Sequence, residues 1–474
     1  MLFSSTIFLF GFLPAVLFIY YLFLRKTKKI KNYFLLLSSL IFYAWGEPKF
    51  VIMLIISIIM NWMFGLVIDK NRENKVKSRL IISIMLICDL SILVVFKYLG
   101  FILSNVNEIF KTNIIVPHIA LPIGISFFTF QAISYVIDVY RNSGKVQKNI
   151  LNVGLYLAFF PQLIAGPIVR YETVSEQIDG RKESVQLFTQ GVYRFLLGLF
   201  KKVLISNQMA MIADIAFDNN PSSVLFAWLG AIAYFIQIYF DFSGYSDMAI
   251  GLGKMFGFEF NENFNYPYVS KTITEFWRRW HISLSTWFRD YVYIPLGGSK
   301  CKPSRAFFNM FVVWLLTGIW HGASWNFILW GLYFFIFLFI EKNLLKEKIK
   351  EVDSFSWWKK ALLHIYTLII VLFGWVLFRA TSLTNVIEYI RSMFGLSGIP
   401  ITDINFTMYL TNKLPFLVAG ILFSTPIYLK IKTIMDKNKY VSTIVSPIIL
   451  VSLFLITISF LVKGTYNPFI YFNF

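Results

Sequence analysis

The amino-acid sequence predicts an all-α, polytopic integral membrane protein with roughly 11–13 membrane spans plus re-entrant and interfacial helices. Composition is the first reason: 57% of the 474 residues are hydrophobic and 15% are charged, whereas a soluble domain carries about 25% charged residues. The second reason is a series of long apolar runs without the alternation typical of β-strands. Backbone amides in hydrocarbon need internal partners, so these runs are expected to be helices.

The expected spans follow one another along the whole chain. Residues 1–24 contain no charged residue, so they lack the basic region of a cleavable signal peptide. We interpret residues 3–24 as a retained first span with an extracytoplasmic N-terminus. The other expected spans cover residues 32–46, 49–68, 80–96, 119–137, 149–165, 190–205, 223–240, 306–320, 322–340, 358–378, 407–428 and 441–462.

Positive charge is concentrated in short clusters between the apolar runs. Lys and Arg number 44 against 25 Asp and Glu, which gives a formal net charge of +19. In a soluble protein this excess would indicate nucleic-acid binding. Here the clusters follow the positive-inside rule, so both are expected to be cytoplasmic and the partner is a lipid bilayer, with no nucleic acid. They consist of Arg25, Lys26, Lys28, Lys29 and Lys31, and of Lys70, Arg72, Lys75, Lys77 and Arg79.

Several classes of site and architecture are missing from the sequence. No repeat with a period of about 20–50 residues is visible, so we expect a single membrane-embedded domain over residues 1–474 with a motif core at 159–331. Cys88 and Cys301 form neither a metal-ligand spacing nor a disulfide framework. No phosphate-binding glycine loop, paired-histidine metal motif or nucleophile elbow is present. We therefore expect no metal and no bound cofactor.

Two segments interrupt the pattern of simple spans. FFPQLIAGP at residues 159–167 contains two prolines and a glycine, as a broken helix or a pore lining would, with packing and helix termination as the alternative. Region 241–305 mixes acids, glycines and prolines, so re-entrant and interfacial helices are expected there. Gln237 and Asp241 are four residues apart and would share a helix face. They are candidates for lining a cavity or positioning a substrate, with packing and helix termination as the alternative here too.

Residues 274–291, TEFWRRWHISLSTWFRDY, form an amphipathic pattern at helical period. Most of the aromatic side chains lie on one stripe and most of the charged ones lie opposite, which predicts one helix in the membrane interface. His281 lies at the edge of the apolar stripe. It is a candidate for facing a cavity, and the alternative is an ordinary interfacial histidine.

His321 is the second candidate. Fifteen mostly apolar residues, 306–320, precede it, which is only about 22 Å of helix, so His321 is expected at a break within or near the membrane. Gly318 and Gly322 would let another backbone or a substrate approach closely. An intramembrane ionisable residue is a functional candidate by default, although a hydrogen-bonded core histidine is the alternative. His118 and His364 are interpreted as structural.

Imidazole suits acyl transfer because its pKa lies near working pH. It can remove a proton from a sugar or polyol hydroxyl while that oxygen attacks an acyl carbonyl. The residues that could orient the ring are Trp280, Trp320, Ser324 and Asn326, and the sequence does not choose among them.

Two linked motifs carry a resemblance to a known family. WRRWHISLSTWFRDYVYIPLGG at 277–298 and GIWHGASWNFILWG at 318–331 resemble the membrane-bound O-acyltransferase family. Four further segments of the chain resemble sequences of the bacterial alginate O-acetyltransferase branch of this family. A D-alanyl transferase branch, which acts on teichoic acids, shares the paired-histidine core. The further segments are FFPQLIAGPIVRY at 159–171, YFDFSGYSDMAIGLGKMFGF at 239–258, NFNYPYVSKTITEFW at 263–277 and NPFIYFNF at 467–474.

The resemblance implies a bacterial plasma-membrane acyltransferase in which a cytoplasmic acyl donor meets an outside acceptor through a central funnel or tunnel. His321 matches the essential membrane histidine of the family, and His281 matches its second histidine. The implied donor is acetyl-CoA, and the implied acceptors are hydroxyls of an extracellular polysaccharide. The implied partners are an extracytoplasmic serine-hydrolase-like acetyltransferase, which would complete a relay, and a polysaccharide biosynthesis complex. The alternatives are D-alanyl transfer to teichoic acids and a non-catalytic transporter or scaffold.

Overall fold

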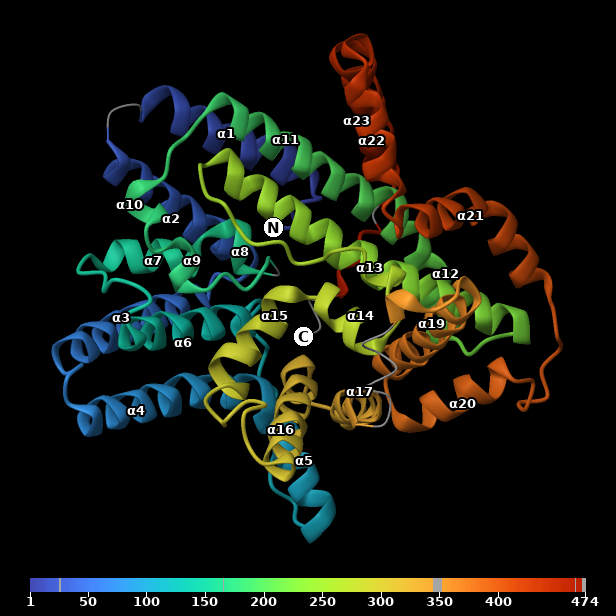
Figure 1. Ribbon diagram of the computed structural model, residues 1–474, viewed down its shortest axis with the longest axis horizontal. Helices are drawn as coiled ribbons and strands as arrows, with labels where there is room; N and C mark the ends of the chain where they lie inside the picture. The colour runs from blue at the N-terminus through green and yellow to red at the C-terminus, as the bar shows by residue number, and fades with distance from the viewer. Residues whose placement is uncertain (25–26, 165, 344–351, 465, 471–474) are drawn as a thin grey trace. The chain divides into compact units, whose positions relative to one another are not determined.

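The computed structural model describes residues 1–24, 27–164, 166–343, 352–464 and 466–470, and within these ranges it contains helices and no strand (Figure 1). The all-α prediction is thereby confirmed. The chain divides into two compact units, Met1–Phe195 with Ser246–Asn261 and Leu196–Tyr245 with Glu262–Phe474. The single domain expected over residues 1–474, with its motif core at 159–331, stays a prediction. Arg25 and Lys26 of the first basic cluster, and the last four residues of the C-terminal motif, lie outside the described residues.

The first unit contains the N-terminal helices. Short π-helical turns at Phe8–Phe12, Ile19–Phe23 and Val94–Tyr98 interrupt or join them. The α-helices are α1 (Leu13–Phe18), α2 (Lys28–Gly46), α3 (Val51–Lys70), α4 (Lys75–Leu93), α5 (Leu99–Phe110), α6 (Ile125–Arg141), α7 (Ile150–Ala158), α8 (Phe160–Leu163), α9 (Tyr171–Val174), α10 (Gln177–Gly180) and the first part of α11 (Val185–Phe200).

The second unit contains the rest of α11 and most of the C-terminal helices. Its π-helical turns are Lys201–Ser206, Arg289–Tyr293 and Val441–Val445, and its 3₁₀ turns are Pro267–Val269 and Val352–Ser354. The α-helices are α12 (Asn207–Asp218), α13 (Val224–Met255, whose last residues belong to the first unit), α14 (Ile273–Arg279), α15 (Ile282–Phe288), α16 (Pro303–His321), α17 (Trp325–Asn343), α19 (Trp357–Arg379), α20 (Leu383–Met393), α21 (Ile404–Phe423), α22 (Ile427–Lys437) and α23 (Ser446–Lys463).

Among the described residues, eight helices are long and apolar enough to cross a membrane. This confirms a polytopic membrane protein but gives fewer spans than the roughly 11–13 expected from apolar runs. Some expected spans are shorter helices: residues 3–24 contain the apolar helix Phe8–Phe23, and residues 149–165 are divided between α7 and α8. The eight are Val51–Lys70, Lys75–Phe110, Val185–Asp218, Val224–Met255, Trp325–Asn343, Trp357–Arg379, Ile404–Phe423 and Val441–Lys463.

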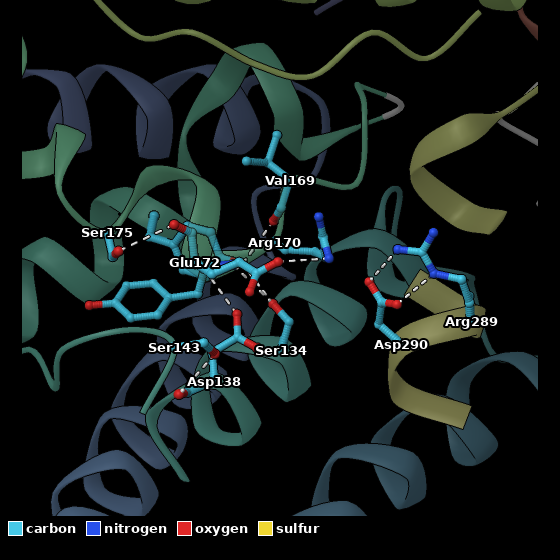
Figure 2. Close-up of polar contacts among 11 residues, drawn as sticks. Ser134, Asp138, Ser143, Val169, Arg170, Glu172, Ser175, Arg289 and Asp290 are labelled. Carbon is cyan, nitrogen blue, oxygen red and sulfur yellow. Dashed lines mark hydrogen bonds and ion pairs between the residues drawn. The ribbon is translucent and has the colours of Figure 1, made fainter. Parts of the chain in front are cut away.

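The proline-containing segment after α7 is a broken helix that packs inside the first unit. Phe159 separates α7 from α8 with φ −54° and ψ 113°, and residues 160–163 are buried. The chain that follows is held by side chains of the preceding helices (Figure 2). The Asp138 carboxylate accepts a hydrogen bond from the Glu172 N–H at 2.9 Å, and the Tyr156 hydroxyl donates to the Val169 carbonyl at 2.8 Å. These contacts favour packing and helix termination over a pore lining.

Helix α13 corrects the expectation for region 241–305. The expected irregular backbone after residue 240 is wrong, because α13 continues through DFSGYSD to Met255. Both carboxylates of that segment are paired, which removes the cost of burying them on a helix. Asp241 Oδ1 lies 2.5 Å from Lys202 Nζ, and both side chains are 1% exposed. Asp247 Oδ1 lies 2.6 Å from an Arg194 guanidinium nitrogen. The re-entrant or interfacial placement of residues 262–305 stays a prediction.

The C-terminal segment 466–470 completes the buried pair in the second unit. The Ile470 N–H donates to Asp241 Oδ2 at 2.9 Å, and the Lys202 ammonium donates to the Pro468 carbonyl. The Phe469 ring lies 4.7 Å from the Tyr245 ring, centroid to centroid. Each charge therefore has an ionic partner and a backbone hydrogen bond.

Glycines allow α16 and α17 to pack backbone to backbone, and Figure 1 shows the two helices side by side. A Cβ atom on Gly331 would lie 2.4 Å from the Trp314 carbonyl oxygen, and one on Gly318 would lie 2.4 Å from the Phe327 carbonyl oxygen. The close approach expected at Gly318 is thus made by the backbone of α17.

Replacing Lys202 by Met should lower the stability of the protein by about 3–5 kcal/mol, because Asp241 would remain buried without its cation. The double variant Lys202→Met/Asp241→Leu should recover most of this loss. Thermal unfolding of the full-length protein in detergent, followed by size-exclusion chromatography, measures the effect. Equal stability of the wild type and the single variant would contradict it.

Substituting Gly331 by Ala should destabilise the α16–α17 contact by about 1–3 kcal/mol, because the added methyl group overlaps the Trp314 carbonyl. Gly11→Ala is the matched control, since a Cβ atom at Gly11 has nothing within 4 Å. The melting temperatures of both variants test this expectation. A Gly331→Ala protein as stable as the Gly11→Ala control would contradict the prediction, because it would show that α16 and α17 can move apart with little loss of free energy of unfolding.

Candidate active site

His281 lies at a break between two short helices of the second unit. Helix α14 ends at Arg279 and α15 begins at Ile282, and His281 between them has φ 44° and ψ 53°, in the left-handed region. The prediction of one continuous helix over residues 274–291 is therefore wrong, because the helix is interrupted at residues 280–281. A neighbouring loop supplies the reason: the Ile282 N–H donates to the Asn263 carbonyl at 2.9 Å, and the Asn265 N–H donates to the Arg279 carbonyl at 2.9 Å. These bonds take backbone groups that a continuous helix would use internally.

The N-terminus of α14 is held by two caps. Thr272 Oγ1 accepts from the Glu275 N–H at 3.0 Å, and Glu275 Oε2 accepts from the Lys271 N–H at 2.9 Å, in an arrangement close to a capping box. Glu341, near the end of α17, adds a buried carboxylate that accepts from the N–H groups of Ile273 and Thr274 at 2.6 and 2.7 Å. These caps fix the helix that leads into His281.

The His281 imidazole is almost fully buried, at 1% exposed. Its Nδ1 lies 3.1 Å from Asn263 Oδ1, and its ring packs edge to face with Phe242 at 4.6 Å between centroids. Among the described residues, its Nε2 atom has no hydrogen-bond partner. Burial lowers the pKa of His281 to about 3, so the imidazole is neutral near pH 7. A neutral, buried ring with a free nitrogen suits proton transfer.

His321 is the last residue of α16, where the helix ends. Gly322 follows in extended backbone, with φ 177° and ψ 161°, so the break expected near His321 is confirmed. The imidazole is 4% exposed. Aromatic rings pack edge to face around it: Trp320 at 4.9 Å, Trp330 at 4.8 Å and Phe378 at 5.1 Å between centroids. These rings come from α16, α17 and α19.

Both histidines line one cavity of about 260 Å³ within the second unit. Most of its wall is aromatic or aliphatic, and two exposed arginines, Arg278 and Arg289, also line it. A mostly apolar cavity with a few convergent polar groups is the usual form of a small-molecule site. The other lining residues are Thr274, Trp277, Trp280, Leu284, Ser285, Phe288, Tyr293, Met310, Val313, Trp314, Thr317 and Leu338.

Two of the candidate orienting residues lie beside the histidines. Trp280 lines the cavity and packs 4.8 Å from Trp375, centroid to centroid. Trp320 contacts both imidazoles, with its ring centroid 6.0 Å from that of His281 and 4.9 Å from that of His321. Trp320 is therefore positioned to couple the two rings, although it does not belong to the described lining of the cavity.

The remaining candidates lie outside the described lining of the cavity. Ser324 precedes α17, and its carbonyl accepts from the Ile328 N–H. Asn326 donates its amide to the Ala380 carbonyl at 2.6 Å and so joins α17 to the end of α19. Gln237 is buried on α13, where its carbonyl accepts from Ser206 Oγ. Asp241 belongs to the buried pair with Lys202, one residue before the Phe242 ring that contacts His281.

The most informative site residue missed by sequence reasoning is Asn263. It is completely buried and lies eighteen residues before His281 in the chain, ahead of α14 and outside any helix shared with His281. Its position inside the segment NFNYPYVSKTITEFW was the only available signal. His364, by contrast, lies away from the cavity, with Nδ1 2.9 Å from the Ser270 carbonyl oxygen.

Comparison with known proteins finds extensive similarity. The chain is 42% identical over 412 residues to the probable alginate O-acetylase AlgI of Pseudomonas aeruginosa, covering 85% of this chain and 77% of that protein. It is 36% identical over 435 residues to the peptidoglycan O-acetyltransferase of Helicobacter pylori, covering 85% and 82%. Similarity to the teichoic acid D-alanyltransferase of Bacillus subtilis is 30% over 273 residues, covering 54% and 68%.

A model of the membrane-bound O-acyltransferase family matches residues 41–383. This range contains both histidines and every residue that lines the cavity. The cavity thus lies in the part of the chain that the family shares. The chain is an O-acyltransferase, and it belongs to the membrane-bound O-acyltransferase family.

Proposed function

We propose that this enzyme moves an acetyl group from acetyl-CoA, on the cytoplasmic side of a bacterial plasma membrane, toward hydroxyls of an extracellular polysaccharide. The observation that carries the proposal is that His281 and His321 line the same cavity. The relatives in Pseudomonas and Helicobacter, which are named as O-acetylating enzymes, favour acetyl as the group transferred. The two basic clusters support an extracytoplasmic N-terminus, because they place residues 25–31 and 69–79 in the cytoplasm.

The histidines provide the acid–base chemistry of acyl transfer. An acceptor oxygen attacks the carbonyl carbon of the thioester while His321 takes the hydroxyl proton. The carbon–sulfur bond then breaks, the ester is complete, and the proton returns from the imidazolium to the leaving thiolate. His281 presents a second imidazole, which is neutral near pH 7, to the same cavity, and the surrounding aromatic rings exclude water that would hydrolyse the thioester.

The size and charge of the cavity support a short acyl group and an anionic donor. A volume of about 260 Å³ lies below the range of about 300–1,000 Å³ that is usual for drug-sized ligands, which favours acetyl over a long fatty acyl chain. The exposed Arg278 would attract the phosphates of coenzyme A, whereas the Arg289 guanidinium is already paired with the Asp290 carboxylate (Figure 2).

The same volume supports a relay in place of direct transfer to a polymer. A cavity of this size accommodates an acetyl group and an acceptor hydroxyl but not a polysaccharide segment. An extracytoplasmic serine-hydrolase-like acetyltransferase, working within a polysaccharide biosynthesis complex, would take the acetyl group through its own hydroxyl nucleophile and place it on the polymer.

Replacing His321 by Ala should abolish ester-linked acetate on the cell-surface polymers to the level of a deletion strain, because the cavity loses its proton acceptor. General-base catalysis contributes about 10²–10⁴-fold to such reactions. Acetate released by mild alkali from purified polymers is the measurement, with the membrane level of each variant determined in parallel. His118→Ala is the matched control, since His118 is exposed and lies outside the described lining of the cavity.

The other outcomes of this experiment distinguish the alternatives. Wild-type acetylation in the His321→Ala strain, with loss in the deletion strain, would overturn catalysis by His321 and indicate a transporter or scaffold. Unchanged acetate in the deletion strain would overturn acetyl transfer, and ester-linked D-alanine on teichoic acids would then be measured.

A further inference from the structure

Asn263 contacts the Nδ1 atom of His281 and thereby sets which ring nitrogen carries the proton. Its Oδ1 atom lies 2.9 Å from Ser283 Oγ, 3.2 Å from the Ser283 backbone nitrogen and 3.1 Å from His281 Nδ1. All three residues are buried, with Asn263 at 0% and His281 at 1% exposed. A single amide oxygen therefore contacts both the imidazole and the first turn of α15.

The backbone N–H of Ser283 decides the orientation of the Asn263 amide. Amide oxygen and nitrogen are assigned from their hydrogen bonds, and a backbone N–H can only donate. The Asn263 atom that faces it must therefore be the oxygen. A flipped amide would place an NH₂ group against the Ser283 N–H and leave two buried donors facing each other.

The oriented oxygen then decides the tautomer of His281. An amide oxygen can only accept, so a hydrogen bond across the 3.1 Å to His281 Nδ1 requires a proton on Nδ1. Ser283 Oγ also lies 3.4 Å from Nδ1, but its hydroxyl donates to Asn263 Oδ1 at 2.9 Å, so toward Nδ1 it can only accept. A neutral imidazole carries one N–H, so Nε2 holds a lone pair. That Nε2 atom is buried without a partner among the described residues, and His281 lines the cavity together with His321.

We propose that Asn263 is a positioning residue that holds His281 as the Nδ1–H tautomer, so that its Nε2 lone pair is offered to the acyl-transfer cavity as a second proton acceptor beside His321. The inference rests on the proposed function, because that function gives His281 a role in acyl transfer. It adds that Asn263 fixes the tautomer in which His281 takes this role. The left-handed backbone of His281 contributes, because it turns the chain so that residues 281 and 283 both face Asn263. Residues that orient a reactive histidine through its second nitrogen set the reactivity of the first.

The wild-type protein tests the tautomer directly. The chain has four histidines, so full-length protein labelled with ¹⁵N at histidine and reconstituted in lipid gives few imidazole signals, and the His281 pair is identified by its loss in His281→Gln. The expected spectrum has His281 Nδ1 in the protonated range and Nε2 in the unprotonated range. A protonated Nε2 would overturn the proposal without recourse to any variant.

Two variants of Asn263 separate positioning from packing. Asn263→Leu keeps the approximate size but removes the acceptor, so we expect mixed tautomers and a fall in kcat of about tenfold or more with little change in KM. Asn263→Asp keeps an acceptor oxygen and should restore the Nδ1–H tautomer and part of kcat. An Asn263→Leu enzyme with unchanged tautomer and kcat would overturn the proposal.

Asn309→Leu is the matched control for losing a buried asparagine. Asn309 is also 0% exposed, and its amide donates to the Gly298 carbonyl at 3.0 Å, away from both histidines. Its tautomer signals and kcat should match the wild type. A fall in kcat equal to that of Asn263→Leu would overturn positioning in favour of general destabilisation. If the spectra are as expected but the enzyme transfers no acetate, the proposed function fails while the tautomer assignment stands.

Discussion

The close packing of α16 and α17 is the constraint on which the site depends. Gly318 and Gly331 bring the two backbones into contact, and both ends of α17 then act on the histidines. Near its start, Trp330 packs against His321. At its far end, Glu341 caps α14, the helix that leads into His281. One helix pair, brought together by two glycines that have no side chain, thus helps to determine the positions of both histidine rings.

Three buried or half-buried carboxylates of the two units have cationic partners. Asp241 is paired with Lys202, Asp247 with Arg194, and Glu183 with Lys31. An isolated charge in a low-dielectric interior is costly, whereas a paired and hydrogen-bonded one is tolerated. This pairing lets α13 continue as a helix through a segment whose composition indicates a break.

The site combines two buried imidazoles with aromatic walls. Burial lowers the pKa of His281, so that ring is neutral near pH 7. His281 is oriented by an amide, and His321 is enclosed by aromatic edges. Such an environment suits a base that takes a proton only briefly, as the proposed transfer from a thioester to a hydroxyl requires.

The sequence by itself determined the helical membrane class, the two histidines and the break at His321. Hydrophobic run length, charge placement and helical rise are local properties, and they can be counted along the chain. Only the tertiary structure decided that residues 274–291 form two helices, that α13 is unbroken, and that Asn263 contacts His281. Each of these depends on a hydrogen bond or ion pair between residues far apart in the chain, such as Asn263 with Ile282 or Lys202 with Asp241. Periodicity carries no information about such partners, because it records only which side chains share a face of one helix.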